Sequence, residues 1–200
     1  EHRDQKHEKA LAAISADPTI TEIILSGGDP LLLDDQALGE LIANLELIPH
    51  LKRLRIHSRI PVVLPERITS GLLAILRQTR LKTAIVIHSN HPNELNKSTA
   101  NALTAIRNAE VLMLNQAVLL KGVNNTVDIQ VSLAEELYNQ GVQPYYLHMP
   151  DHVAGTAHFF VDNEEARLIY KGMQAKLPGY LLAKLVREIP GENAKQIVQL

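Results

Sequence analysis

Histidines stand at the ends of three apolar segments, where parallel strands often present their catalytic side chains. His57 ends LKRLRIHS, His88 lies in TAIVIHS and His148 lies in PYYLHM. With Asp151, neutral imidazoles at these positions could hold a catalytic metal ion, as histidines and carboxylates do in barrel hydrolases. No His-x-His pair occurs on these segments, so the alternative is that each histidine is a hydrogen-bonding wall residue. Further histidines follow in neighbouring loops: His91, His152 and His158.

A glycine-rich segment, Ser26-Gly27-Gly28-Asp29-Pro30, follows the apolar run at 21–26. Glycines let a ligand approach the backbone closely, and exposed N–H groups can bind an anion. The Asp29 carboxylate could bind an ammonium group. The structural alternative is a tight turn in which Asp29 serves as a cap, and the motif alone does not decide between the two.

Four other polar residues occupy comparable positions. Arg59 comes just after the segment that ends in His57-Ser58, where a guanidinium can bind phosphate or carboxylate through two hydrogen bonds; a surface ion pair is the alternative. Asn115 and Gln116 lie within an otherwise apolar segment, so their amides must bond to backbone, water or ligand. Lys195 could form a Schiff base if its loop folds over the site, and is otherwise a solvated lysine.

These candidates need a scaffold in which strands and helices alternate. Apolar segments predict strands at 21–26, 51–58, 83–89, 111–120, 144–149 and 181–189. Helical spacing of apolar residues predicts helices at 4–16, 34–48, near 68–78, near 93–108, near 127–140 and near 163–176. Strands that alternate with helices at this period indicate parallel βαβ units with right-handed crossovers.

Polar residues follow the carboxyl end of every predicted strand. In a barrel they would all face one mouth, whereas an open doubly wound sheet concentrates its site at one switch point. We therefore predict an α/β fold, a partial (β/α)6-type parallel barrel, formed by residues 1–200 as a single domain.

The composition excludes several classes of function. The 200 residues are 46% hydrophobic, and 20 Lys+Arg against 22 Asp+Glu give a net charge of −2, so neither nucleic acid nor an anionic membrane is an expected partner. No apolar run approaches the roughly 18 residues of a membrane span, and the charged opening residues do not resemble a signal peptide. A cytoplasmic protein is expected. The absence of cysteine excludes thiolate nucleophiles and thiolate-held metal clusters from what the chain does alone.

Six segments, in this order, resemble motifs of the lysine 2,3-aminomutase family of radical S-adenosylmethionine enzymes. They are LSGGDPL (25–31), HSRIPVVLPERIT (57–69), HSNHPNE (88–94), LNQAVLLKGVN (114–124), PYYLHMPDHVAGTAHF (144–159) and PGENAK (190–195). Three stretches, RLRIHSR, YYLHM and VREIPGENAK, look most similar to the bacterial branch that makes (R)-β-lysine for modification of elongation factor P. The resemblance runs essentially from end to end and implies a radical barrel enzyme.

The resemblance implies a role for each matching residue. The residues implied to bind S-adenosylmethionine are Ser26, Gly27, Gly28, Asp29, His88 and Gln116. His57 and Ser58 fall in the same cofactor-binding set. Lys195 matches the lysine that carries pyridoxal phosphate, His148 a position that contacts it, and Arg59 is a candidate for its phosphate. Asp151 and Glu188 match acidic positions that bind the distal ammonium of the substrate.

The implied reaction converts L-α-lysine to (R)-β-lysine with S-adenosylmethionine, pyridoxal phosphate and a [4Fe–4S] cluster. Elongation factor P and its lysyl-transferring ligase are implied as functional partners, and a homo-oligomer is possible. In the family a CxxxCxxC loop after the first strand holds the cluster, and this chain has no cysteine. We therefore expect a fragment of a longer chain that lacks the first strand and cluster loop and is inactive alone.

Two other hypotheses remain open from the sequence. One is a His/Asp metal-dependent hydrolase on a barrel, and the other is a non-catalytic binding module that has lost the cluster.

Overall fold

The structure, a computed structural model, describes residues 2–151, 155–192 and 194–198, without the side chains of residues 2–6. Seven strands within these ranges form one sheet whose order follows the chain from β1 to β7. The strands are β1 (Glu22–Leu25), β2 (Arg53–Ser58), β3 (Lys82–Ile87), β4 (Leu112–Val118), β5 (Gln143–His148), β6 (Lys184–Arg187) and β7 (Gln196–Ile197). β1 to β6 pair in parallel, and β7 runs antiparallel to β6.

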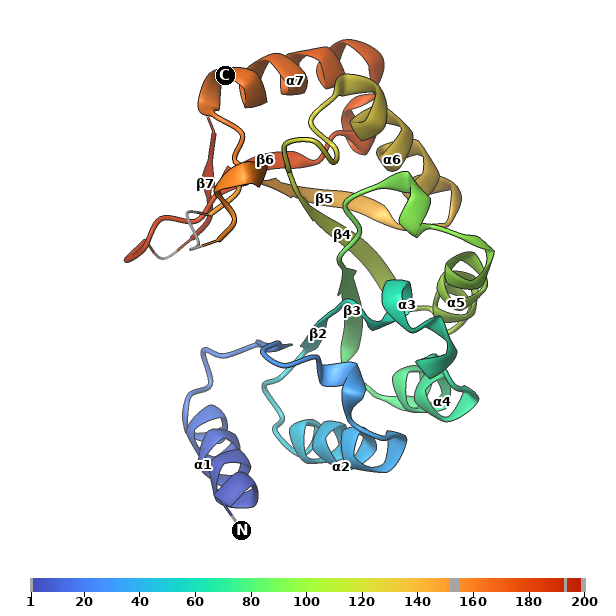
Figure 1. Cartoon of the computed structure of the whole chain (residues 1–200). Helices are drawn as coiled ribbons and strands as arrows, with labels where there is room; N and C mark the ends of the chain where they lie inside the picture. The colour runs from blue at the N-terminus through green and yellow to red at the C-terminus, as the bar shows by residue number, and fades with distance from the viewer. Residues whose placement is uncertain (1, 152–154, 193, 199–200) are drawn as a thin grey trace.

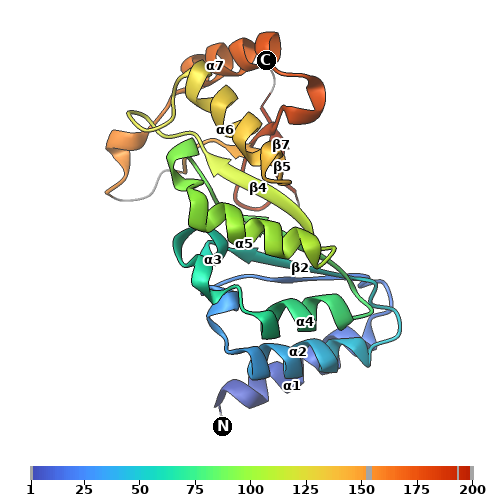
Figure 2. The same cartoon turned by 90° about the vertical axis from the view of Figure 1, so that its right-hand side faces the viewer.

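The longer helices that follow β1 cover the convex face of this curved sheet, and none of the described α-helices lies on its concave face (Figure 1; Figure 2). The α-helices are α1 (His2–Ala16), α2 (Asp35–Glu46), α3 (Ile60–Val63), α4 (Ser70–Gln78), α5 (Lys97–Asn108), α6 (Val127–Asn139) and α7 (Asn163–Lys176). Short 3-10 helices are η1 (Pro30–Leu32), η2 (Pro65–Arg67), η3 (Pro92–Glu94), η4 (Ala157–Phe159) and η5 (Gly179–Leu181). A doubly wound sheet reverses its strand order and carries helices on both faces. The sequential order and single helical layer instead confirm the predicted partial barrel.

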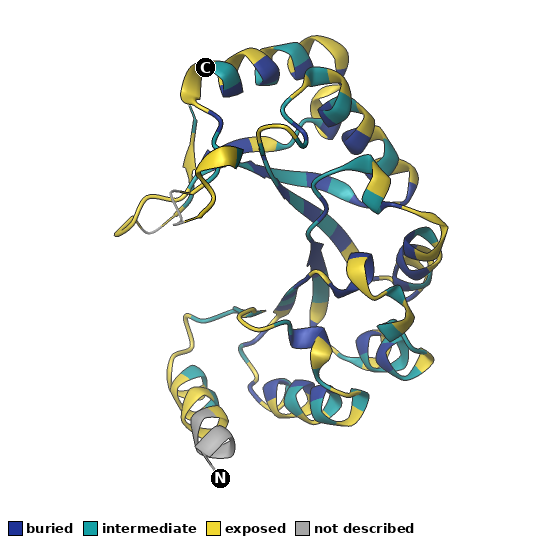
Figure 3. Cartoon of the chain, in the orientation of Figure 1, coloured by how far each residue is buried: buried dark blue, intermediate teal, exposed yellow. Residues whose placement is uncertain are grey.

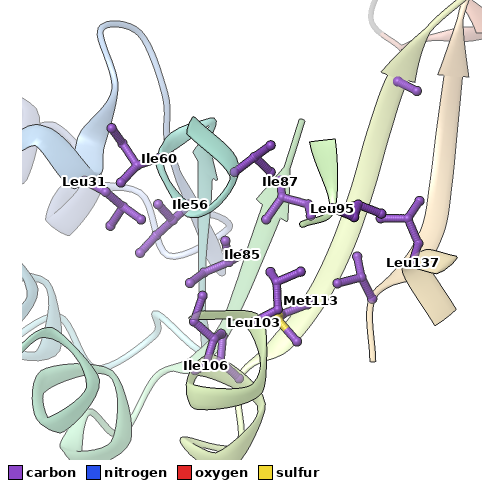
Figure 4. Close-up of a cluster of buried hydrophobic side chains, with 14 of the residues drawn as sticks. Leu31, Ile56, Ile60, Ile85, Ile87, Leu95, Leu103, Ile106, Met113 and Leu137 are labelled. Atoms are coloured by element: carbon purple, nitrogen blue, oxygen red, sulfur yellow. The ribbon is translucent and has the colours of Figure 1, made fainter. Parts of the chain in front are cut away.

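The core lies between the sheet and its helices (Figure 3). In β2, the side chains of Leu54 and Ile56 are fully buried toward the helices, while the alternate residues Arg55 and His57 are only half-buried. Figure 4 shows Ile56 and Ile85 of the sheet in the same apolar cluster as Leu103 of α5. The alternation in each strand thus separates core residues from residues available to a site.

The structure also differs from the sequence prediction at several boundaries. The helix expected near 93–108 begins only at Lys97, because the Asn96 side chain accepts hydrogen bonds from the N–H groups of Ser98 and Thr99. The strand expected at 181–189 is shorter, since η5 occupies its beginning. β7 was not predicted because a two-residue strand has no recognisable period. None of the described helices is long and apolar enough to cross a membrane.

Arg80 closes the turn between α2 and β2. Its guanidinium donates to the backbone carbonyls of Glu46 (2.6 and 3.0 Å), Ile48 (2.7 Å) and Leu51 (2.8 Å). These carbonyls lie at or just beyond the C-terminus of α2, where no further helical N–H group is available to them. One side chain therefore satisfies the end of this helix.

We expect Arg80→Ala to lower the free energy of unfolding by about 1–2 kcal/mol, because several hydrogen bonds from a charged donor are lost together. Arg77→Ala is the matched control, since Arg77 makes a single 3.3 Å bond to the Asn108 carbonyl; a change within about 0.5 kcal/mol is expected there. Urea unfolding measures both. Equal losses in the two variants would show that Arg80 does not act as a cap.

Candidate active site

Two adjoining cavities open at the carboxyl ends of the parallel strands. The first, about 450 Å³, is lined by the glycine-rich loop after β1 and by the end of β2. The second, about 460 Å³, extends toward β5 and β6. Arg59, His88 and Gln116 line both cavities and so form a shared wall.

The glycine-rich loop needs glycine for its backbone shape. Gly27 and Gly28 have φ values of +81° and +52°, in the left-handed region that side chains with a Cβ rarely adopt. A Cβ added at either residue would meet no atom within 4 Å, so the space beside the backbone is open. A ligand in the first cavity can therefore lie directly against this loop.

Asp29 acts both as a cap and as a link between two strand ends. Its Oδ1 accepts from the Leu31 N–H (3.1 Å), which caps η1, and from the Ser58 hydroxyl (2.7 Å). Its Oδ2 accepts from the Arg59 backbone N–H (2.7 Å). The cap considered for Asp29 from sequence is thus present. These bonds use three of the roughly four acceptor positions of a carboxylate, so Asp29 can still accept a bond from a ligand.

His88 and Gln116 form a polar pair in the shared wall. Gln116 Nε2 lies 3.0 Å from His88 Nε2, and an amide nitrogen only donates, so His88 Nε2 accepts and Nδ1 carries the proton. Burial, followed by the charges of Arg59 and His57, lowers the pKa of His88 to about 4. Gln116 Oε1 and His57 Nε2 are buried without a partner among the described residues. The wall therefore has hydrogen-bonding capacity for a ligand and a neutral imidazole.

Lys195 lies beside Glu188, which lines the second cavity. Its Nζ donates to Glu188 Oε1 and lies 5.8 Å from the ring centroid of Tyr146, which itself stands edge-on to His148 at 5.7 Å. The hydrogen bond from Lys195 is the largest cause that lowers the pKa of Glu188. Burial, then the nearby Lys195 charge, lowers the pKa of His148, whose Nε2 is also buried and unpartnered among the described residues. Lys195 is thus held at the site and not directed into solvent.

Most predicted site residues lie around these two cavities. Those that line them are Ser26, Gly27, Gly28, Asp29, His57, Ser58, Arg59, His88, Gln116, His148, Asp151 and Glu188. Asp151 lies exposed at the rim. Sequence reasoning assigned no role to Asn90, which lines the second cavity, or to Tyr146, whose ring centroid lies 5.8 Å from Lys195 Nζ. Tyr146 could have been found because it precedes His148 by two residues in the same strand.

The loop histidines do not join the site. His91 caps η3, with its Nδ1 accepting from the Asn93 N–H (3.1 Å), and the His158 ring packs against Phe159 at 4.0 Å. His152 lies outside the described residues. Across the described part of the chain, no three His, Asp or Glu side chains are placed to hold a metal ion. The metal-dependent hydrolase considered from sequence therefore lacks a ligand set in these ranges.

Comparison with known proteins shows close relatives. The chain is 49% identical over 188 residues to L-lysine 2,3-aminomutase of Haemophilus influenzae, and 44% identical over 193 residues to that of Escherichia coli. These alignments cover 94% and 96% of this chain and 56% of each relative. Over nearly its whole length the chain is therefore similar to L-lysine 2,3-aminomutases. It spans about half the length of these relatives, and no protein-family model matches it.

Solved structures show that the fold of this chain recurs in more distant proteins. Streptococcus suis SuiB has a TM-score of 0.64 at 12% identity, over 92% of this chain and 43% of SuiB. A radical S-adenosylmethionine methyltransferase from Sphaerobacter thermophilus has a TM-score of 0.56 at 16% identity, over 84% of this chain and 51% of the methyltransferase. At these identities the similarity concerns the fold alone.

The donor groups of the chain suit two family cofactors and not the third. The open, positive-φ glycine loop suits close approach of S-adenosylmethionine. The Lys195 amine beside Glu188 would suit pyridoxal phosphate, with His148 nearby, whose Nε2 has no partner among the described residues. A thiolate-held iron–sulfur cluster does not fit these 200 residues, because they contain no cysteine.

The low pKa of His88 makes stability depend on pH. Folded His88 takes up a proton only near pH 4, whereas the ordinary pKa is 6.5, so the unfolded chain binds more protons between these values. The free energy of unfolding should therefore fall as the pH drops from 6.5 to about 4. Urea unfolding of the wild-type chain and of His88→Asn measures this, and the variant should show the smaller fall.

Near pH 7.5, above both pKa values, His88 takes up no proton in the folded or the unfolded chain. A difference in the free energy of unfolding between wild type and variant at this pH therefore reports lost packing and not titration. An identical pH dependence in the two proteins would contradict the assignment.

Proposed function

We propose that this chain provides the cofactor- and substrate-binding barrel of a radical aminomutase that converts L-α-lysine to (R)-β-lysine. The observation that carries the proposal is the shared wall of Arg59, His88 and Gln116 between two cavities. The glycine-rich loop lies on one side of this wall, and the Lys195–Glu188 pair lies beyond it on the other. Such a wall puts a radical source and an amine carrier next to each other.

In this proposal the first cavity binds S-adenosylmethionine. The glycine loop lies along the ligand, Asp29 and Ser58 hold the loop in place, and His88 with Gln116 bonds polar groups at the wall. His57, whose Nε2 is buried and unpartnered among the described residues, offers a further bond. Residues 26–29 therefore bind and orient the ligand.

The second cavity binds pyridoxal phosphate and the substrate. Lys195 carries the pyridoxal group, Arg59 binds its phosphate and His148 contacts its ring. Asp151 and Glu188 bind the distal ammonium of lysine, and this selects against neutral side chains because they cannot pair with the two carboxylates. When bound, S-adenosylmethionine would supply a radical for hydrogen abstraction after one-electron reduction by an iron–sulfur cluster held outside these 200 residues, and pyridoxal phosphate would carry the migrating nitrogen.

The proposal also covers the cluster and the biological context. Because no thiolate is present, cluster ligands would have to come from outside these 200 residues, and we propose that the chain alone does not catalyse the reaction. The segments RLRIHSR and VREIPGENAK support assignment to the branch that serves elongation factor P and its lysyl-transferring ligase. The missing cysteines also favour one second candidate, a binding module that has lost catalysis.

Pyridoxal labelling tests the role of Lys195. The chain is incubated with pyridoxal phosphate, reduced with borohydride and digested, and the modified lysines are identified by mass spectrometry. We expect the pyridoxyl group mainly on Lys195, because its amine is held at the cavity, and at least about tenfold less on exposed Lys121. Lys195→Ala should abolish the main product, whereas Lys121→Ala should not. Equal labelling of the two lysines would refute the role.

Lysine binding tests Asp151. We expect Asp151→Asn to weaken L-lysine binding to the pyridoxal-loaded chain about tenfold, which corresponds to about 1.4 kcal/mol for one partly exposed charge pair, and to leave the neutral analogue norleucine unaffected. Asp34→Asn is the matched control because it removes the same charge from an exposed residue that lines neither cavity, and asparagine still caps α2. Calorimetry gives both affinities. A lower melting temperature with unchanged lysine affinity would show that Asp151 only stabilises its loop.

A further inference from the structure

β3 and β4 separate as they approach the mouth. Their backbone pairing ends at Ile87 opposite Asn115. Beyond this point the Asn115 side chain continues the pairing: its Oδ1 accepts from the Ser89 N–H (2.8 Å), and its Nδ2 donates to the Ser89 carbonyl (3.0 Å). Asn115 is 3% exposed and Ser89 is fully buried. One amide thus replaces a pair of backbone hydrogen bonds.

A second link of the same kind follows. Asn90 Oδ1 accepts from the Val118 N–H (2.8 Å), and Asn124 Nδ2 donates to the carbonyls of Asn90 (2.8 Å) and Val118 (2.9 Å). Bonds through side chains keep the two backbones farther apart than the roughly 4.8 Å of directly paired strands. The backbone groups are satisfied while the strand ends diverge, and the second cavity lies at this divergence.

We propose that Asn115 is a positioning residue that holds His88 against Gln116. His88 directly precedes Ser89, and Gln116 directly follows Asn115. Neighbouring strand residues face opposite sides, so Asn115 acts from the helix-covered side while Gln116 faces the cavity. The 3.0 Å contact between His88 and Gln116 then depends on the two bonds between Asn115 and Ser89. The catalytic importance of this pair rests on the proposed function, but its geometry does not.

The chemistry at position 115 requires an amide. Ser89 presents one donor and one acceptor, and only a side chain with one of each matches both. Leucine has a similar volume and offers neither, so it would leave two buried backbone groups unpaired. Aspartate offers the acceptor for the Ser89 N–H and places a second oxygen against the Ser89 carbonyl. Leucine therefore removes the link to Ser89 completely, and aspartate removes it in part.

The test uses nitrogen-15 NMR of the His88 ring in the ligand-free chain, with the signal assigned by His88→Asn. In wild type the Nδ1–H tautomer should dominate, because His88 Nε2 accepts from Gln116. Asn115→Leu should lower the ratio of Nδ1–H to Nε2–H about fivefold to tenfold, the equilibrium effect of one neutral hydrogen bond. Gln116→Leu, which removes the partner itself, should give the same change.

Gln140→Leu is the control for a general loss of stability. Gln140 is a buried amide whose bonds, to the Leu95 carbonyl and to Glu136, involve neither Ser89 nor Gln116, so its replacement should leave the His88 signals unchanged. If Asn115→Leu does not fold, Asn115→Asp is measured instead. A wild-type tautomer ratio in either folded variant overturns the proposal. Because no cofactor is present, such a failure is distinct from a failure of Lys195 labelling.

Discussion

The parallel pairing of β1 to β6 is the constraint on which the rest of the structure depends. Parallel strands end at the same edge of a sheet, so residues far apart in the chain converge there without any special loop. The single helical layer follows from the same pairing, because each right-handed crossover returns along the same face. One face is thereby filled by the core, and the half-buried residues of the other face are available for ligands.

Convergence alone does not hold the loops in place, and polar side chains perform that task. Asp29 joins the end of β1 to the end of β2, and Asn115 joins the end of β3 to β4. Both act where backbone pairing stops, because N–H and carbonyl groups at a strand end still need partners. The groups that shape the mouth are therefore also the groups that satisfy its backbone.

Burial determines the charge of the mouth. The pKa values of His57, His88 and His148 are all lowered mainly by burial, so neutral imidazoles line a region that also holds Arg59 and Lys195. Neutral rings add no repulsion to these cations. Glu188 balances Lys195, and the guanidinium of Arg59, which has no hydrogen-bond partner among the described residues, is suited to an anionic group such as phosphate.

The sequence by itself determined the order of the six parallel strands and the main helices, the barrel class and the similarity to lysine 2,3-aminomutases, since these depend on local periodicity and on short motifs. It also placed candidate residues at strand ends, and most of them line the two cavities. Only the tertiary structure decided their partners. The bonds of Asp29 to Ser58 and of Asn115 to Ser89 join residues 29 and 26 positions apart, and whether they form depends on the register between strands. Periodicity within one segment carries no information about that register.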